Sequence, residues 1–526
     1  MKINKYIMVL GMGLMALTSC NMDEAPTTSV SVEDANHAIN DRLQLDAMER
    51  GINQSFRACM YGDMSMVDEV MCDGFNATSD FGNNKGPIHR TDVSLTASDE
   101  DVESMWSNMY GAIKNYNIFI DNVERYVQID TLPENQAEAR YGQAEARFFR
   151  AYSYLQLVRH YAKAYDAATA GQELGVPLVL HFDLKAKPAR ATVAEVYKRI
   201  KVDLDSAALQ LNKVAGEARA ERPTVDALNM MYARYYLDIK DYANAAKYAQ
   251  KVIDTKKYLL SATADEMAAE YTNDEGTEPI MQLPATLTEN GSGTNKDYTR
   301  FDAYALLKQY GYPGGGLYEE PYFLPSQKLL DQYEDNDLRG EQWFQTGVYT
   351  VHLAGRFFAR GIITFNKYEG NPALTSNGVP NGRQHVKPFL ISEAYLIAAE
   401  ANFKAGNVPA AKTALNAIQK ARKATLTEAT EETIENEWFK ETVGEGLRMS
   451  CLKRWGKGFD GRAAQPFAAK YGAALTDDPK SSVHVYDLKK LSADDYHWAW
   501  PIPAHEFRLN DNLKQNKGYD ENENEN

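Results

Sequence analysis

Residues 390–422 read LISEAYLIAAEANFKAGNVPAAKTALNAIQKAR, and this stretch decides the fold. Apolar residues recur at helical spacing on both sides of Gly406-Asn407, which predicts two helices joined by a tight turn. Pro409 suits the first turn of the second helix, because the amide hydrogen that proline lacks would have no partner there. The inward positions of the second helix are mostly small residues, which let antiparallel helices approach closely. The stretch therefore predicts a helical hairpin.

Residues 225–254 predict a second hairpin of the same kind, with its turn at Lys240-Asp241. Ala245 in this hairpin and Ala411 in the first stand at equivalent places among the inward-facing residues. The shared alanine spacing favours an internal repeat, and two unrelated helical hairpins are the alternative. Paired hairpins of this type predict a tetratricopeptide-like scaffold.

Further helices are predicted upstream of the two hairpins. Ser98 and Asp101 mark the start of one, which continues with apolar residues at helical spacing. Another is expected at about 138–165. The capping box of Thr192 and Glu195 opens a third.

Between the two hairpins the chain changes character. Residues 270–385 are rich in glycine and tyrosine, and they predict loops, a few short strands and one helix near 326–333. Long irregular segments in compact proteins are usually functional, so we expect a ligand site in this part. The predicted fold class is mainly α, a tetratricopeptide-like helical-hairpin scaffold with a loop-rich ligand-binding half that contains a few short strands. We expect one interleaved domain at 41–519, with the scaffold at about 98–260 and 386–460, the loop-rich part at about 50–97 and 261–385, and a disordered tail at 520–526.

The first twenty residues have the pattern of an exported lipoprotein. Lys2 and Lys5 precede an apolar run that ends at Leu17 and is too short to span a bilayer. Leu17-Thr-Ser-Cys20 resembles a bacterial lipobox, in which the cysteine thiol is acylated and becomes the first residue. An ordinary signal peptide with an incidental cysteine is the alternative. The pattern predicts a signal peptide at 1–19, lipid attachment at Cys20, and a lipidated N-terminus and tether at 20–40.

Composition limits the classes of partner. The chain has 526 residues, 44% hydrophobic and 25% charged, which is typical of globular proteins. Its formal net charge of −16 is expected to repel nucleic acid and anionic membrane surfaces. No later segment is long and apolar enough for a transmembrane helix. We therefore expect a folded body that is held at a membrane by its lipid and binds no nucleic acid.

The sequence provides little support for catalysis. The nine histidines are scattered without the spacing of a zinc site, and the acidic stretch that starts at Asp335 lacks the ligands of a calcium loop. Glu445 and Arg448 stand three positions apart, and with Arg454 they are interpreted as structural ion-pairing residues on one helix. We predict no catalytic residue, no metal and no cofactor, and a hydrolase is a weak alternative.

Besides Cys20 the chain has three cysteines, which is not the pattern of a disulfide framework. They are Cys59, Cys72 and Cys451. A bridge between Cys59 and Cys72 and a set of buried thiols are both compatible with the sequence.

Two stretches have the composition of a sugar-binding surface, which needs aromatic faces beside amide, carboxylate or guanidinium groups. They are residues 73–92 and residues 310–322, and Trp343 follows the second stretch in the sequence. The alternative for each ring is packing beneath its own loop. The candidate ligand-binding residues are Asp73, Phe81, Asn83, His89, Tyr312, Tyr318 and Trp343.

Motifs spread over nearly the whole chain resemble the SusD/RagB-like family of nutrient-binding outer-membrane lipoproteins. The segment most similar to the family is Glu393–Ala401. The others are Trp106–Tyr110, Glu145–Tyr152, Glu445–Gly456 and Pro501–Tyr519. Gly444, Ser450 and Cys451 depart from the usual pattern of the family, at positions expected to pack a helix.

The resemblance implies a surface-exposed, glycan-binding lipoprotein of the outer membrane that faces the extracellular side. It also implies a partner, a SusC-like TonB-dependent β-barrel transporter that receives the oligosaccharide or polysaccharide. A peptide-binding member of the same architecture is the first alternative. A tetratricopeptide-like assembly scaffold that binds only proteins is the second.

Overall fold

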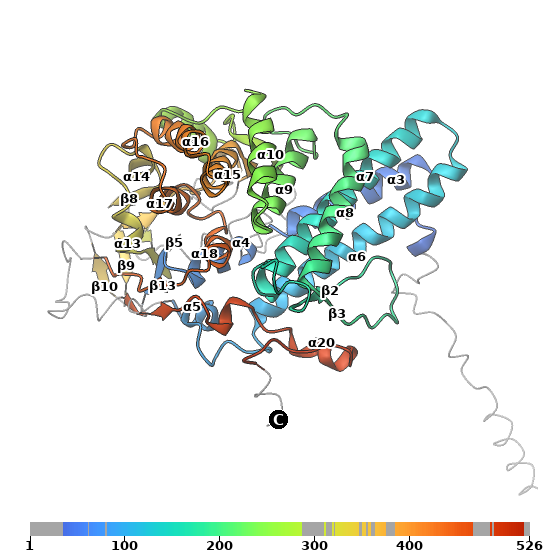
Figure 1. Cartoon of the computed structure of the whole chain (residues 1–526), viewed down its shortest axis with the longest axis horizontal. Coiled ribbons are helices and arrows are strands. Elements are labelled where there is room, and N and C mark those ends of the chain that lie inside the picture. The colour runs from blue at the N-terminus through green and yellow to red at the C-terminus, as the bar shows by residue number, and fades with distance from the viewer. Residues whose placement is uncertain are drawn as a thin grey trace, which may run out of the picture.

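The computed structural model describes residues 35–60, 63–78, 81–286, 310–311, 318–319, 321–346, 350–353, 356–358, 363–374, 384–465, 484–485 and 489–519. This part of the chain is mainly helical with short strands, as predicted (Figure 1). None of the described helices is long and apolar enough to cross a membrane. Cys20 and Tyr312 lie outside the described residues.

The longer helices form the scaffold, and the shorter ones lie mainly in the loop-rich part or near the C-terminus. The longer helices are α3 (Arg42–Ala58), α6 (Glu100–Ile129), α7 (Pro133–Tyr161), α8 (Val193–Leu211), α9 (Val225–Asp238), α10 (Tyr242–Asp254), α15 (Ile391–Lys404), α16 (Val408–Ala421) and α17 (Glu431–Glu441). The shorter ones are α4 (Asp63–Met71), α5 (Gly86–Arg90), α11 (Ala264–Tyr271), α13 (Gln327–Leu330), α14 (Leu338–Gln342), α18 (Arg448–Trp455) and α20 (Ala504–Leu509). Two 3-10 turns are η2 (Pro372–Leu374) and η3 (Tyr496–Trp498).

The strands are short and form several small sheets. They are β1 (Phe75–Thr78), β2 (Leu174–Pro177), β3 (Arg190–Thr192), β4 (Pro279–Leu283), β5 (Tyr310–Gly311), β6 (Tyr318–Glu319), β7 (Phe323–Pro325), β8 (Phe344–Thr346), β9 (Thr350–Leu353), β10 (Arg356–Phe358), β11 (Ile363–Phe365), β12 (Val386–Leu390), β13 (Phe459–Asp460), β14 (His484–Val485) and β15 (Lys490–Leu491). In one sheet β1 lies between β14 and β7, antiparallel to both. β12 pairs with β4 and leads directly into α15.

The two predicted hairpins are present and pack against each other. Figure 1 shows α9, α10, α15 and α16 next to one another, and α10 contacts α15 directly. Lys240 and Gly406 take the left-handed conformation in the two turns, with φ of 62° and 82°. Ala245 and Ala411 are both fully buried. The small residues therefore lie between packed helices, as the sequence predicts.

The helix limits differ from the predicted ones where a local cap decides them. The first long helix is capped by Asp99 rather than Ser98, because the Asp99 carboxylate accepts from the amides of Asp101 and Val102 at 3.0 and 3.1 Å. The second is α7, which begins at Pro133 and ends at Tyr161 instead of covering 138–165. The capping box of Thr192 at the start of α8 is confirmed.

The three cysteines within the described part are free and buried, so no bridge joins Cys59 to Cys72. Burial raises the pKa of the Cys59 thiol to about 12 and that of Cys451 to about 11. These thiols therefore belong to the apolar interior.

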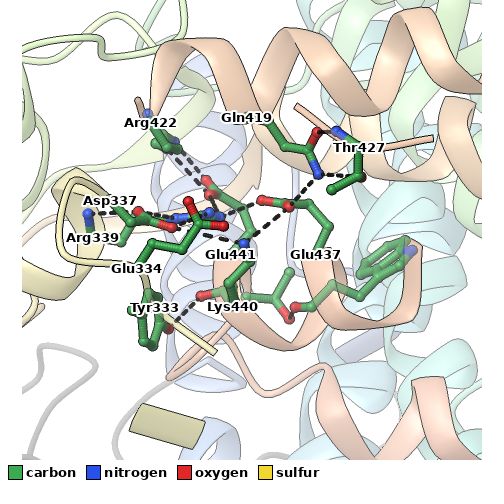
Figure 2. A network of polar contacts seen from close by, with 12 residues as sticks. Tyr333, Glu334, Asp337, Arg339, Gln419, Arg422, Thr427, Glu437, Lys440 and Glu441 are labelled. Carbon is green, nitrogen blue, oxygen red and sulfur yellow. Dashed lines mark hydrogen bonds and ion pairs between the residues drawn. The ribbon is translucent and has the colours of Figure 1, made fainter. Parts of the chain in front are cut away.

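A buried network of charges joins the loop-rich part to the scaffold (Figure 2). Arg339, at the start of α14, pairs with Asp337 at 2.8 Å and with Glu437 and Glu441 of α17 at 2.6 and 2.9 Å. Its guanidinium group is fully buried. This arginine therefore attaches the segment before β8 to the helix that follows the second hairpin.

Arg422, directly after α16, extends the same network. It pairs with Glu441 at 2.5 Å and with Glu278, just before β4, at 2.8 Å. Burial favours the neutral form of Glu441, but Arg422 and Arg339 outweigh it and lower the pKa of Glu441 to about 2. Glu441 therefore stays ionised between the two arginines.

Replacing Arg422 by methionine should leave Glu278 with uncompensated charge in the interior and remove one of the two arginines that pair with Glu441. Removing one partner of a buried ion pair costs about 3–5 kcal/mol. We therefore expect Arg422→Met to lower the free energy of unfolding by about that amount, measured by urea denaturation.

Arg42→Met is the matched control, because Arg42 pairs with Asp46 on the surface with 41% of its side chain exposed. It should cost at most about 1 kcal/mol. Equal effects of the two substitutions would contradict the role assigned to the network.

Candidate functional site

The 81–95 loop, which leads from β1 towards α6, forms the candidate ligand surface. Its backbone turns repeatedly into the left-handed region, at Gly82, Asn83, Lys85 and Thr91, with φ between 45° and 63°. Several non-glycine residues with positive φ in one short loop require surrounding contacts that hold them there. The loop is therefore a fixed feature of the surface.

The side chain of His89 anchors the 81–95 loop to the interior of the protein. Its buried ring lies between β1 and α4, where Nδ1 bonds the carbonyl of Val70 and Nε2 accepts from the amide of Ala77 at 3.3 Å. Burial and the nearby charge of Arg462 lower the pKa of His89 well below its usual range, so the ring is neutral. Arg462 also donates to the carbonyl of His89 at 2.8 Å.

Asp73, at the other end of the first predicted stretch, is fully buried as well. Its carboxylate accepts two hydrogen bonds from Arg448, at 2.8 and 2.9 Å, and one from Lys328 at 2.7 Å. Burial would raise the pKa of Asp73, but the charges and hydrogen bonds of Arg448 and Lys328 outweigh it and lower that pKa well below its usual range. The carboxylate therefore joins the segment before β1 to α13 and α18.

Trp343 packs in the interior of the loop-rich part and is 1% exposed. The ammonium of Lys367 lies 4.0 Å from the centre of its ring, and the rings of Tyr271 and Tyr368 lie 5.1 and 5.5 Å from the same ammonium. Lys367 also donates to the carbonyls of Glu441 and Val443. An aromatic cage is thus present, and the chain's own lysine fills it.

The prediction that Asp73, His89 and Trp343 contact a ligand is therefore corrected. All three side chains are buried, as the alternative of packing beneath loops anticipates. Hydrogen bonds within the chain hold Asp73 and His89, and the ring of Trp343 packs against the ammonium of Lys367. Tyr318 lies in β6, beside the two residues of β5, and only the strand position of this tyrosine is described.

Phe81 and Asn83 remain at the surface. The Phe81 ring is half-buried and meets Phe323 edge-on at 6.1 Å between ring centres. Asn83 is exposed, and its side-chain oxygen accepts from the Arg90 guanidinium at 2.6 Å. Tyr322, from the second predicted stretch, is half-buried, and its carbonyl accepts from the amide of Thr78 at 2.8 Å.

Arg90 orders the outer edge of the loop. Besides Asn83, its guanidinium group donates to Asp92 at 3.2 Å and to the hydroxyl of Ser94 at 2.8 Å. Val93, between these two partners, is 81% exposed. The side chain of Arg90 therefore fixes two polar groups on either side of an exposed apolar residue.

Tyr496, from a distant part of the chain, lies next to this edge. It is 38% exposed and stacks on His497 at 3.9 Å between ring centres, while His497 Nε2 lies 3.1 Å from the carbonyl of Asp92. Lys489 donates to the carbonyl of Thr91 at 2.9 Å. We call Phe81, Asn83, Arg90, Val93 and Tyr496 the ligand surface.

Sequence reasoning missed Arg90, Val93 and Tyr496. Arg90 follows His89 within residues 73–92, and the pattern that selected this stretch includes guanidinium groups, so it could have included Arg90. Val93 lies one residue beyond that stretch. Nothing in the sequence indicates that Tyr496 lies beside them, because the contact depends on the fold.

A separate pocket lies between the scaffold and the segment before α18. Its volume is about 60 Å³, and its lining includes the paired Arg234 and Glu393 as well as Tyr152 and Leu447. Ligand pockets usually have about 300–1,000 Å³, so this pocket is too small for a sugar chain. Among the residues that the structure describes, no group of side chains is arranged to hold a metal ion.

The expected pairing of Glu445 with Arg448 is also corrected. α18 begins at Arg448, so Glu445 precedes the helix and pairs with Lys367 at 3.0 Å. Arg448 pairs with Asp73, and Arg454 pairs with Glu400 at 2.7 Å. All three residues are structural, as predicted, but with partners from other elements.

Known proteins resemble this chain over most of its length. A family model described as "Starch-binding associating with outer membrane" matches residues 23–237, and one described as "SusD family" matches residues 359–519. Starch-binding protein SusD of Bacteroides thetaiotaomicron is 23% identical over 491 residues, which cover 82% of this chain and 80% of that protein.

Solved structures share the fold. A SusD superfamily protein from Bacteroides thetaiotaomicron has a TM-score of 0.70 at 23% identity and covers 90% of this chain and 99% of its own. A laminarin-binding SusD-like protein has a TM-score of 0.68 at 18% identity, with 91% of this chain and 100% of its own covered. At these identities the likeness shows the fold alone.

Replacing Asp73 by asparagine should break the ion pair between the segment before β1 and α18 and leave Arg448 without its counter-charge. We expect the free energy of unfolding to fall by about 3 kcal/mol at pH 7. The folded-state pKa of Asp73 lies below the unfolded value, so the stability it contributes is fully present above about pH 4 and is lost as the pH falls through the folded pKa. The difference between parent and variant should therefore narrow below about pH 4.

Urea denaturation from pH 7 to pH 3 measures this effect. Asp511→Asn is the control, because Asp511 pairs with Lys187 at 3.2 Å while 82% exposed. A difference for Asp73→Asn that stays constant over the whole pH range would contradict the assignment.

Proposed function

This chain belongs to the SusD/RagB-like family, and on that basis we propose that it binds an oligosaccharide or polysaccharide on the ligand surface and delivers it to a TonB-dependent outer-membrane transporter. The family binds glycans, works with SusC-like transporters and is associated with the outer membrane. Its members bind carbohydrate without catalysis, which agrees with the prediction that this chain is not an enzyme.

The observation that supports the site is the composition of the fixed 81–95 loop. A pyranose ring presents an apolar face and a rim of hydroxyl groups, so its binding needs an aromatic or aliphatic contact beside oriented polar groups. Phe81 and Val93 provide apolar contacts, and Asn83 and Arg90 provide an amide and a guanidinium group that are bonded to each other at 2.6 Å. Tyr496 adds an exposed ring from a separate segment.

The rigidity of this loop supports binding rather than packing. The contacts of Arg90, His89 and Arg462 set the positions of the polar groups before a ligand arrives. A surface that is already ordered loses less conformational entropy on binding. The proposal also includes contacts between the glycan and Tyr312 and Tyr318, which belong to the predicted stretch 310–322.

Isothermal titration against a panel of polysaccharides and oligopeptides tests the function. We expect at least one glycan to bind, and Phe81→Ala to weaken that binding by about tenfold, which corresponds to about 1.4 kcal/mol. Phe81→Trp should retain it, since a ring remains in place.

Leu209→Ala is the matched control, because Leu209 is 71% exposed on α8, outside the ligand surface. Tyr312→Ala tests the second stretch in the same assay. Peptide binding without glycan binding would support the peptide-binding alternative, and binding of proteins alone would support the scaffold. Product formation on prolonged incubation with a bound glycan would support a hydrolase.

Membrane attachment is the second part of the proposal. We propose that lipid on Cys20 anchors the body to the outer membrane on the extracellular side. The attachment needs a lipid because the formal net charge of −16 opposes binding of the body to an anionic surface. Cys20→Ala should move the protein from the membrane fraction to the soluble fraction. A variant that stays in the membrane after signal cleavage would contradict the lipid anchor.

A further inference from the structure

Three exposed apolar residues lie together at one end of the scaffold. Leu43, at the start of α3, is 74% exposed, and Ile129 and Leu132, at the turn between α6 and α7, are 51% and 52% exposed. Exposed large apolar side chains are unremarkable singly, but a group of them indicates a contact surface. We call Leu43, Ile129 and Leu132 the apolar tip.

Hydrogen bonds show that these residues share one end of the molecule. Arg42, next to Leu43, donates to the side chain of Asn135 at 3.3 Å, and Asn135 donates to Asp130 at 2.8 Å. Asp130 lies between the two tip residues of the turn and accepts from the amide of Leu132 at 2.9 Å. The tip is thus a fixed part of the fold.

Two charged groups beside the tip, Asp130 and Arg42, have partners within the chain. The carboxylate of Asp130 accepts from the hydroxyl of Tyr126 at 2.5 Å as well as from Asn135 and Leu132. Arg42 pairs with Asp46 at 2.6 Å. Asp41, two residues before Leu43, and Glu134, two residues after Leu132, are also exposed, so the three apolar side chains lie among acidic groups of a protein whose overall charge is strongly negative.

The N-terminal segment enters the fold at the same end. The Asn122 side chain donates to the carbonyl of Ala35 at 2.7 Å and its oxygen accepts from the amide of Ile39 at 3.2 Å. Seven residues separate Asn122 from Ile129, about 10 Å along α6. Figure 1 shows α3 beside this end of α6 and α7.

The length of the tether limits how far a lipid on Cys20 can lie from the tip. Cys20 stands fifteen residues before Ala35. A chain of that length spans at most about 50 Å, and about 20 Å on average if it is unstructured. A lipid on Cys20 therefore places the membrane within reach of the apolar tip.

We infer that the apolar tip contacts the surface of the membrane to which the chain is tethered, as a weak second attachment beside the lipid. The inference rests on the lipid anchor of the proposed function. Apolar residues suit this contact because an acidic body gains nothing from anionic headgroups. Two points of attachment restrict the orientation of the body, which a flexible tether alone would leave free.

Labelling at single positions tests the contact on the full, lipidated chain in protein-free vesicles. Leu132→Cys is labelled with an environment-sensitive fluorophore, since the described native cysteines are buried. Leu426→Cys is the matched control, because Leu426 is 56% exposed and lies between α16 and α17, at the opposite end in Figure 1. We expect quenching by nitroxide-labelled lipid to be at least several-fold stronger at 132 than at 426.

Equal quenching at the two positions would overturn the inference. Disulfide-linked dimers of unlabelled Leu132→Cys would also overturn it, because they would show that the tip contacts a second copy of the chain. Flotation with the vesicles reports the lipid anchor separately. If the chain does not float, Cys20→Ala with a histidine tag at its N-terminus is bound to vesicles that contain nickel-chelating lipid. The comparison of quenching at positions 132 and 426 then tests the membrane contact without the lipid anchor. A variant that combines Leu43→Ser, Ile129→Ser and Leu132→Ser should fold normally, since all three side chains are exposed. It should lose the selective quenching of a fluorophore attached at Gln128→Cys.

Discussion

The paired guanidinium groups of Arg339 and Arg422 are the interaction on which the arrangement of the two parts depends. Both are fully buried, and each binds more than one carboxylate. Their partners come from α17, from the segment before α14 and from the residue before β4, so the network joins chain segments that are far apart in sequence. Placing such charges in the interior is costly, and only complete pairing offsets the loss of hydration. The network therefore tolerates one arrangement of these segments.

The loop-rich part follows the same rule on a smaller scale. Asp73 is paired with Arg448, Lys367 lies in a cage of aromatic rings, and Arg462 donates to backbone carbonyls on both sides of β1. In each case a buried cation holds a segment that has little regular structure of its own. The loop-rich part has short strands and long connections, and these contacts hold its backbone in place. In the scaffold the hydrogen bonds within helices do this.

This order would suit the irregular 81–95 loop to the binding role that we propose for it. The side chains on the inner side of the 81–95 loop, such as His89, bond to other parts of the protein. Those on its outer side, such as Asn83 and Val93, are exposed to solvent. The surface and the apolar tip also lie far apart, since Figure 1 shows α5 well away from the turn between α6 and α7. A body attached at the tip would therefore keep the proposed ligand surface clear of the attachment.

The sequence by itself determined the features that depend on neighbouring residues. The two hairpins, their turns at Lys240 and Gly406 and the capping box of Thr192 were predictable, because helical spacing and caps act over a few residues. The composition also predicted a loop-rich region with short strands. The tertiary structure alone decided which polar and aromatic residues of that region are buried. Asp73 meets Arg448 across 375 positions, and no local pattern reveals such a pairing. Burial depends on contacts that fold distant segments together, so the same residue types that suit a sugar on the surface also satisfy one another in the interior.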